Sequence, residues 1–227
     1  LSVSTQGTYL NQVYVGMFRP DQDAMARWAG NLKQYRLGVV AGRLVTVDAD
    51  GANAINAETG FVAECARSYW TTTDTYWTFR PQGNCIGSNP ASNSPDGNIT
   101  EKGAQGQRLR ASTGRNMMTC TSFACPTTPT ALPAFNTTNI TPTMLGLTST
   151  DTTGRNTLVG YQRGDDVNAE DIDANVTEKR ASAHGDVVHS RPVAINYGTD
   201  ASPQVVVFYG GNDGVLRAIN GNRSTSI

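Results

Sequence analysis

An acidic segment in the second half of the chain carries the residues best suited to bind a metal ion. It reads Asp165-Asp-Val-Asn-Ala-Glu-Asp-Ile-Asp173, and its candidate oxygen ligands are Asp166, Asn168, Glu170, Asp171 and Asp173. Calcium prefers about six to eight oxygen ligands from a flexible loop. The segment lacks the mid-loop Gly and the bidentate Glu that complete an EF-hand loop. Two interpretations therefore stay open, a calcium-binding loop and a solvated acidic loop.

A second and weaker group of oxygen ligands consists of Asp48, Asp50 and Asn53. Asp and Asn side chains accept hydrogen bonds from backbone amides two residues further on, which favours turns. We therefore expect an Asx-type turn between two strands here, in preference to a metal site.

The tripeptide Arg163-Gly164-Asp165 abuts the acidic segment. On an exposed loop such a tripeptide can serve as an adhesion motif, because the metal of an integrin-type receptor captures the Asp carboxylate. The same residues also arise by chance and fit a strand-to-loop connection. Receptor binding is one hypothesis for this site, and calcium bound next to it would then order the motif.

His184, Asp186 and His189 suggest a metal site or an acid–base pair. If residues 186–190 form a strand, Asp186 and His189 point to opposite faces, while His184 and Asp186 share one face. Two ligands on one face do not complete a site, so we expect these residues to satisfy hydrogen bonds at a sheet edge. The sequence also lacks the motifs of serine hydrolases, zinc proteases and nucleotide-binding enzymes.

The four cysteines, Cys65, Cys85, Cys120 and Cys125, allow three disulfide connectivities. Sequential pairing is favoured, because Cys120 and Cys125 close a tight loop and Cys65 and Cys85 close a loop of about 20 residues. A loop of the latter length contributes roughly 3 kcal/mol in the chain-entropy model. Zinc sites need closer Cys spacings or clustered His. Disulfides are therefore favoured over free or metal-bound thiols, and they imply an oxidising compartment.

The composition excludes some classes of function. A net charge of −1 with 16% charged residues argues against a nucleic-acid surface, which needs a concentrated excess of Lys and Arg. No apolar run of about 18 residues is present, so we expect no membrane span in this segment, and no signal peptide is visible. Because the chain begins at Leu1 and not at Met, we expect it to be part of a longer protein.

Runs of β-branched and aromatic residues predict strands on both sides of a loop-rich middle. The predicted strand regions are residues 9–18, 37–47, 61–79, 187–188, 205–209 and 215–219, with a hairpin turn at Gly210-Gly-Asn-Asp-Gly214. From about residue 81 to 153, Asn, Ser, Thr, Pro and Gly dominate without an apolar period, which indicates a functional insertion or a poorly ordered segment. A short helix is expected within it, at residues 103–111.

Three segments resemble one known family. Gly185-Asp-Val-Val-His-Ser-Arg-Pro192, followed by Phe208-Tyr-Gly-Gly-Asn-Asp-Gly-Val-Leu-Arg-Ala-Ile-Asn220, is similar to the β-propeller region of the PilC/PilY family of type IV pilus adhesins and assembly factors. Val13-Tyr-Val-Gly-Met-Phe-Arg-Pro20 with Trp28-Ala-Gly-Asn-Leu-Lys-Gln-Tyr35 resembles the start of that propeller. Ser94-Pro-Asp-Gly97, Glu101-Lys-Gly103 and Leu109-Arg110 are similar to a third family segment. Arg217 departs from the pattern, since the family is expected to carry His at that position.

The resemblance implies an all-β fold, part of a β-propeller with quinoprotein-like blades and a long loop-rich insertion held by a disulfide. Residues 1–80 would form a first blade-like part, 81–180 the insertion, and 181–227 a further, truncated part. Because a ring needs about four to eight blades of about four strands each, the rest of the propeller would have to complete it.

The function that the resemblance implies is work at the pilus tip without catalysis. Such a protein promotes pilus assembly or opposes retraction, supports attachment and motility, and contacts minor pilins and a host or surface receptor. It would be secreted to the bacterial cell surface, as a pilus-tip or outer-membrane-associated protein, and the family's calcium loops favour calcium over any organic cofactor. The alternatives are a periplasmic quinoprotein-like enzyme and an envelope interaction scaffold.

Overall fold

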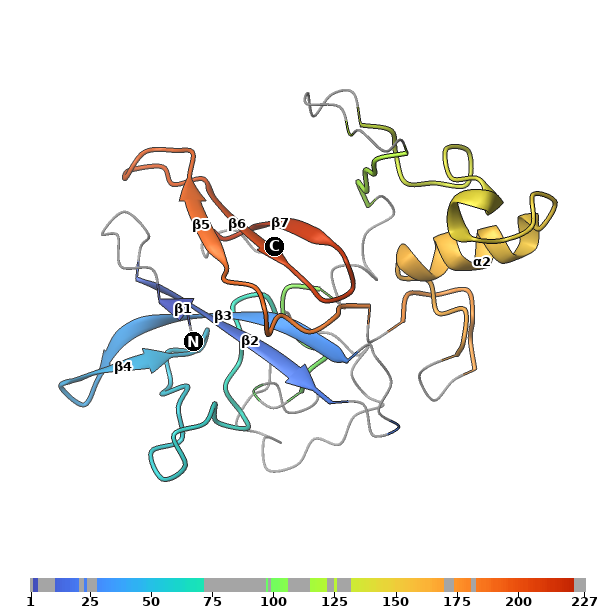
Figure 1. Cartoon of the computed structure of the whole chain (residues 1–227). Helices are drawn as coiled ribbons and strands as arrows, with labels where there is room; N and C mark the ends of the chain where they lie inside the picture. Colours follow the sequence, from blue (N-terminus) through green and yellow to red (C-terminus); the bar gives the residue numbers. More distant parts are fainter. Residues whose placement is uncertain are drawn as a thin grey trace. The chain divides into compact units, whose positions relative to one another are not determined.

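The computed structural model describes residues 2–3, 11–20, 23, 28–71, 97, 99–105, 115–121, 125, 132–169, 174–180 and 183–222. The chain divides into two compact units, unit 1 (residues 1–107 and 184–227) and unit 2 (residues 108–183). The described residues form two antiparallel sheets, one α-helix and one 3-10 helix (Figure 1). The expectation of a mainly β protein is therefore confirmed at this coarse level.

The first sheet of unit 1 has the order β1-β2-β3-β4. Its strands are β1 (Ser2–Val3), β2 (Gln12–Arg19), β3 (Ala29–Val40) and β4 (Arg43–Val47). Side chains alternate between the two faces of a strand. Because Tyr14 lies opposite Gln34 and Val13 lies opposite Tyr35, each of these cross-strand pairs shares one face.

The second sheet of unit 1 has the order β5-β6-β7, with β5 (Val193–Asn196), β6 (Val205–Gly210) and β7 (Leu216–Asn220). β6 and β7 pair from Val206 opposite Asn220 to Gly210 opposite Leu216. The hairpin predicted at residues 210–214 is therefore present. Its last residue, Gly214, has a φ of 76°, a conformation that favours glycine.

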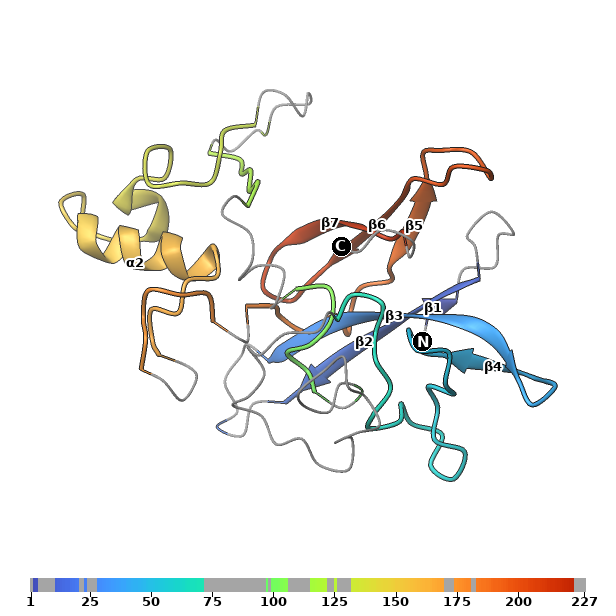
Figure 2. The ribbon, with the colours of Figure 1, turned by 180° about the vertical axis from the view of Figure 1, so that it is seen from behind.

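The two sheets of unit 1 lie face to face and share a hydrophobic core (Figures 1 and 2). The first sheet contributes Tyr14 and Leu32, and the second contributes Val205, Val207 and Tyr209. All five side chains are at most 2% exposed. Burying a side chain of this size contributes about 1.5–3 kcal/mol, so this contact accounts for much of the attraction between the sheets.

The opposite face of the first sheet is covered by the segment that follows β4. Val13 and Tyr35 pack there against Ala54 and Ala66, and all four residues are buried. The middle of the first sheet is therefore covered on both faces.

Buried polar groups also join the two sheets. The side-chain amides of Gln12 and Gln34 both donate to the carbonyl of Gly221, each at 2.8 Å, and the indole N–H of Trp70 donates to the carbonyl of Asn220 at 2.8 Å. Buried polar groups are costly unless they are hydrogen-bonded, so these bonds fix the end of β7 against β2 and β3.

The first half of β3 extends beyond β4 and takes its edge partners from distant segments. Gly30 donates to the carbonyl of His184 at 3.1 Å, Ala104 donates to Leu32 at 2.9 Å, and Tyr69 donates to Gln34 at 2.9 Å. The helix predicted at residues 103–111 is wrong for its described part, because residues 103–105 bend to meet β3. Residues 106–111 lie outside the described residues.

Unit 2 contains the 3-10 helix η4 (Pro142–Leu145) and the helix α2 (Thr152–Gln162), which the sequence did not predict. Asp151 caps α2, because its carboxylate accepts a hydrogen bond from the Gly154 amide at 2.8 Å. The helix has one buried residue, Val159.

Candidate functional site

His184 begins a largely buried polar cluster in unit 1 that also contains Tyr209, Asp213 and Arg217. Its Nδ1 atom donates to the Gly185 carbonyl at 2.5 Å, and its Nε2 atom lies 2.7 Å from the Tyr209 hydroxyl. Since Nδ1 carries the proton, Nε2 accepts from the hydroxyl when the ring is neutral. The two rings also stack, with centroids 5.5 Å apart.

Asp213 and Arg217 form the charged part of this cluster. The Asp213 carboxylate accepts two hydrogen bonds from the Arg217 guanidinium and one from the Gly185 amide at 2.9 Å. Burial has the largest single influence on the pKa of Asp213 and raises it, but Arg217, Gly185 and the charge of His184 together lower that pKa to about 2. Arg217 Nε also donates to the Gln105 side chain at 3.1 Å, so the carboxylate is held ionised within a bonded network.

Asp186 and His189 meet through a third residue. Residues 186–190 do not form a strand, because the chain turns and the Ser190 amide donates to the Val187 carbonyl at 3.2 Å. The Asn212 amide donates to Asp186 at 2.7 Å and lies 3.1 Å from His189 Nδ1. The expectation that Asp186 and His189 point to opposite faces is therefore wrong.

These contacts give the cluster a structural role, which is to join the two sheets of unit 1. The turn after β6 carries Asn212 and Asp213, and both bind the segment of residues 184–189. That segment in turn pairs with β3, since the Gly30 amide donates to the His184 carbonyl at 3.1 Å and Ala29 forms an antiparallel bridge with Gly185. The cluster thus joins both sheets. The sequence singled out the His and Asp residues, but no local signal pointed to Gln105 as a partner of Arg217.

The acidic segment is only partly described. Asp166 is fully buried, its amide donates to the Glu178 carbonyl at 2.8 Å, and Asn168 is exposed. The other candidate ligands, Glu170, Asp171 and Asp173, lie outside the described residues. Among the residues that are described, no group of three or more His, Cys, Asp or Glu side chains could hold a metal. The calcium loop therefore stays a prediction.

Asp48 forms the Asx-type turn that the sequence predicts. Its carboxylate accepts hydrogen bonds from the amides of Asp50 at 3.0 Å, Ala52 at 2.9 Å and Arg67 at 3.1 Å. Asp50 pairs with the Arg67 guanidinium at 2.5 Å, and Asn53 accepts from the Ile55 amide at 3.1 Å. The side-chain oxygens of Asp48, Asp50 and Asn53 thus form contacts with amides and a guanidinium of the protein itself.

The tripeptide of residues 163–165 follows α2 in unit 2. The Arg163 guanidinium donates to the carbonyls of Phe135 at 3.0 Å and Arg115 at 3.3 Å, Gly164 is buried, and Asp165 forms an ion pair with Lys179. The Asp165 side chain is engaged with Lys179 and is 40% exposed. The geometry thus favours a structural role for Arg163 at the end of α2.

Two of the predicted disulfide partners are joined in unit 2. Cys120 and Cys125 form a disulfide with their Cα atoms 5.2 Å apart. Cys65 is also disulfide-bonded, and its predicted partner Cys85 lies outside the described residues.

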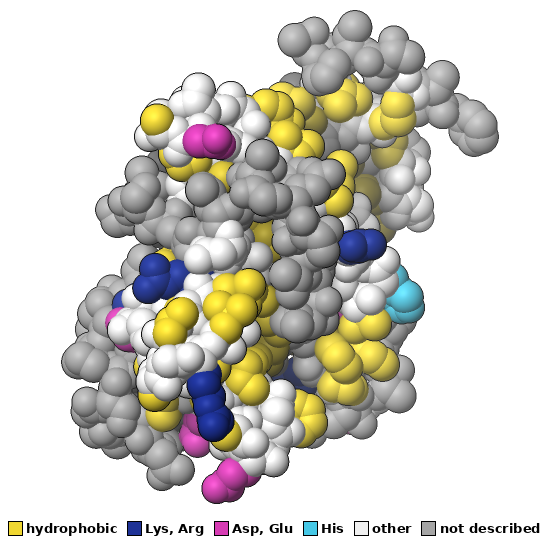
Figure 3. All heavy atoms as spheres, turned by 90° about the vertical axis from the view of Figure 1, so that its left-hand side faces the viewer, with side chains coloured by type: hydrophobic (Ala, Val, Ile, Leu, Met, Phe, Trp, Pro, Cys, Tyr) yellow, Lys and Arg dark blue, Asp and Glu magenta, His cyan; other side chains and the backbone are white. Residues whose placement is uncertain are grey.

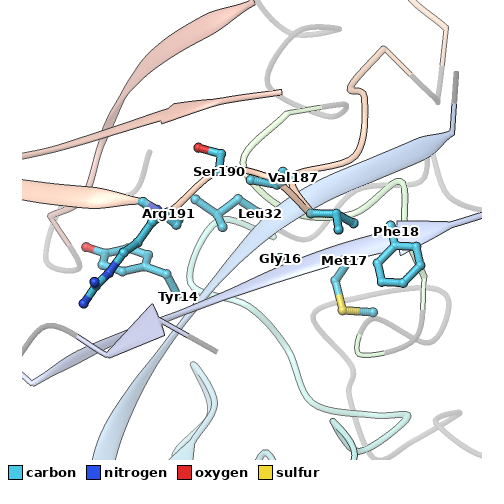
Figure 4. Close-up of a pocket in the computed structure, with 10 residues that line it drawn as sticks. Tyr14, Gly16, Met17, Phe18, Leu32, Val187, Ser190 and Arg191 are labelled. Atoms are coloured by element: carbon cyan, nitrogen blue, oxygen red, sulfur yellow. The ribbon is translucent and has the colours of Figure 1, made fainter. Parts of the chain in front are cut away.

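A cleft of about 520 Å³ opens beside β2 in unit 1. Tyr14, Gly16 and Phe18 of β2 lie on one side, and Val187 and Arg191 of the segment before β5 lie on the other (Figure 4). No sequence motif pointed to this cleft, because the residues on its two sides are about 170 positions apart in the chain.

A comparison with protein-family models, curated proteins and solved structures finds no match to this chain. Among the helices of the described residues, none has the length and apolar character needed to cross a bilayer.

Proposed function

We propose that this chain is part of the β-propeller of a PilC/PilY-like protein, which acts at the tip of type IV pili without catalysing a reaction. The observation that carries the proposal is the sequence of residues 185–192 and 208–220, which resembles the propeller region of that family. The two segments also bind each other, through Asp186 with Asn212 and Gly185 with Asp213. Their contact supports reading them as one structural unit.

The packing of the sheets supports the propeller part of the proposal. Propeller blades are small antiparallel sheets that stack around an axis, so an inner blade is apolar on both faces. The second sheet buries one face against the first sheet. Its other face carries Val193, Ile195 and Leu216, whose exposed fractions are 52%, 38% and 78%. We propose that another blade covers this face in the complete protein.

Exposed apolar side chains are visible as yellow areas on the face of the molecule drawn in Figure 3. Apolar side chains gathered on a surface mark sites of interaction more often than isolated ones do. This distribution supports a protein that works through contacts with other chains or blades, including the minor pilins that we propose as partners.

A disulfide and a buried ion pair support a role in attachment under mechanical load. The disulfide between Cys120 and Cys125 closes a loop of unit 2, and the ion pair of Asp213 with Arg217 holds a turn of unit 1. Disulfides persist in oxidising compartments, which agrees with a secreted, surface-exposed protein. We further propose that calcium binds the acidic loop of residues 165–173 and orders it for adhesion.

Immunogold electron microscopy with antibodies raised against this chain tests the proposed location. We expect gold particles at the ends of surface pili and at the outer membrane, and none in a strain that lacks the gene. Label confined to the cytoplasm, or spread along the pilus shaft, would contradict the proposal.

A further inference from the structure

The turn of residues 174–177 in unit 2 carries a tripeptide that can accept an oligosaccharide. The chain has five tripeptides of the type Asn-x-Ser/Thr, which begin at Asn98, Asn136, Asn139, Asn175 and Asn222. In N-linked glycosylation the side-chain nitrogen of such an Asn receives a sugar, and the acceptor lies in a surface loop. Because the tripeptide alone is common, the surroundings of each Asn decide whether the folded protein can carry the sugar.

Two of the five tripeptides lie on one turn of unit 2 and are engaged in the fold. Asn136 is half-buried, and its side-chain oxygen accepts from the amides of Thr138 at 3.0 Å and Asn139 at 2.9 Å. The side-chain nitrogen of Asn139 donates to the Ala134 carbonyl at 2.9 Å, and the next residue, Ile140, is 5% exposed. Both carboxamides therefore hold the turn that precedes η4.

Two further tripeptides lie in unit 1, and each holds a required side chain against the protein. The side-chain oxygen of Asn222 accepts from the Val205 amide at 2.9 Å, at the start of β6. Asn98 lies outside the described residues, but Thr100, which supplies the hydroxyl of that tripeptide, is 5% exposed. Neither tripeptide presents its full acceptor sequence at the surface of the folded unit.

Asn175 differs from these four residues because its whole tripeptide is exposed. Asn175, Val176 and Thr177 are all exposed, and half of the Val176 side chain is open to solvent. Close behind them, Lys179 forms an antiparallel bridge with Asp165, which anchors the turn on the segment that follows α2. A sugar on Asn175 would therefore extend into solvent without displacing the core of unit 2.

The two side chains that the acceptor sequence requires are bonded to each other here. The Thr177 hydroxyl donates to the side-chain oxygen of Asn175 at 2.7 Å, and the Thr177 amide donates to the same oxygen at 3.0 Å. Two donors on the oxygen draw electron density from the carboxamide nitrogen, so the protons of that nitrogen become more acidic. The nitrogen itself lies 3.4 Å from the Glu178 carboxylate. The acceptor nitrogen and the hydroxyl are therefore presented together at the surface.

We propose that Asn175 is a site of N-linked glycosylation. Its side-chain nitrogen forms a bond to the anomeric carbon of an oligosaccharide that is carried on a lipid diphosphate. The bond between that carbon and the diphosphate oxygen breaks, the lipid diphosphate leaves, and one proton of the carboxamide passes to a base of the transferase. The modification requires passage through a compartment outside the cytoplasm, as disulfides do. It does not depend on the pilus function, which the electron microscopy of pili tests separately.

Mass spectrometry of tryptic peptides, from protein purified out of the organism that makes it, tests the proposal. The peptide of residues 164–179 contains Asn175 as its one acceptor tripeptide, and the peptide of residues 116–155 contains Asn136 and Asn139. We expect the first peptide to carry the mass of an oligosaccharide and the second to be unmodified. An unmodified Asn175, or an oligosaccharide on another of the five residues in its place, would overturn the proposal.

Substitutions in the same organism separate the tripeptide from its surroundings. Asn175→Gln and Thr177→Ala should each abolish the added mass, whereas Thr177→Ser keeps the hydroxyl and should retain it. Asn139→Gln is the matched control in the same unit and should leave the modified peptide unchanged. Added mass that persists on residues 164–179 in Thr177→Ala would indicate another kind of modification and would also overturn the proposal.

Discussion

Asp213 and Arg217 hold the turn after β6 because each buried charge satisfies the other. Their side chains are 7% and 3% exposed, and the carboxylate also accepts the Gly185 amide. A buried ion pair is not strongly stabilising compared with apolar packing, but removal of one partner leaves an uncompensated buried charge. The effect of a substitution should therefore be much larger here than at a surface pair.

Asp213→Asn should lower the free energy of unfolding by about 3 kcal/mol, because Arg217 loses its counter-charge in a buried site. Urea denaturation of the purified chain measures the difference. The control is Asp50→Asn, which breaks the pair with Arg67, where the Asp50 side chain is 40% exposed. The control should cost less than about 1 kcal/mol. Equal losses for the two variants would contradict this account.

The same carboxylate predicts a pH dependence of stability. The folded-state pKa of Asp213, about 2, lies below its usual value of 3.8. The contribution of the Asp213 carboxylate to the free energy of unfolding, roughly 2 kcal/mol, is therefore fully present above about pH 4 and is lost as the pH falls toward 2. We expect the difference in unfolding free energy between wild type and Asp213→Asn to shrink over that interval. A difference that stays constant down to pH 2 would show that another group dominates.

At the residue scale, hydrogen bonds between residues close in sequence could be predicted, and hydrogen bonds between residues distant in sequence could not. The Asp48 turn follows from residue type, because its partners at Asp50 and Ala52 are close in sequence. Asp186 and His189 meet only through Asn212, which folding brings from more than 20 residues away. In the sequence, Arg217 stood out only because it departs from the pattern of the family that the chain resembles. Its contacts with Asp213 and Gln105 explain why a long cationic side chain fits at this position.

At the element scale, Gly30 allows two chain segments to come together. A Cβ atom at this position would lie 2.3 Å from the Asp186 Cα atom, where the segment of residues 184–186 crosses β3. Neither backbone can yield without breaking the hydrogen bond from Gly30 to His184.

Gly30→Ala should therefore lower the free energy of unfolding by about 3 kcal/mol, since it forces packed backbones apart. Thermal and urea unfolding followed by circular dichroism measure the change. Gly16→Ala is the matched control in the same sheet, because its Cβ atom would make an ordinary contact with Val187 at 3.6 Å. The control should change stability by less than about 1 kcal/mol. A mild effect at Gly30 would mean that the two segments are not in contact.

β6 and β7 could be predicted from their β-branched and aromatic residues, whereas the first half of β3 and the helix α2, among other elements, could not. The first half of β3 buries the polar residues Asn31, Lys33 and Gln34, so its sequence does not show an apolar pattern. α2 contains Gly154, Gly160 and several Thr residues, which are poor helix formers. It forms because Asp151 caps its first turn, and such a capping contact is a weak signal in a Ser- and Thr-rich stretch.

At the scale of the whole molecule, the exposed face of the second sheet is the surface that should differ between this chain and the complete protein that we propose. Val193 and Leu216 are 52% and 78% exposed here, and a neighbouring blade would bury them. The double substitution Val193→Thr with Leu216→Thr should change the unfolding free energy of this chain by less than about 1 kcal/mol.

In a longer form that completes the propeller, the same double substitution should lower the melting temperature by several degrees, because it would place two hydroxyl groups in an apolar interface. Parallel melts of the two forms, by differential scanning fluorimetry, measure this contrast. An equally small effect in both forms would exclude a further blade on this face.

The most direct test of the central claim is the number of surface pili in a strain that lacks this gene, counted by electron microscopy with and without an active retraction motor. We predict that pili are lost when the motor is active and return when it is disabled, because the function that we propose is to promote pilus assembly or oppose retraction. Unchanged pilus numbers in both backgrounds would contradict the proposed function.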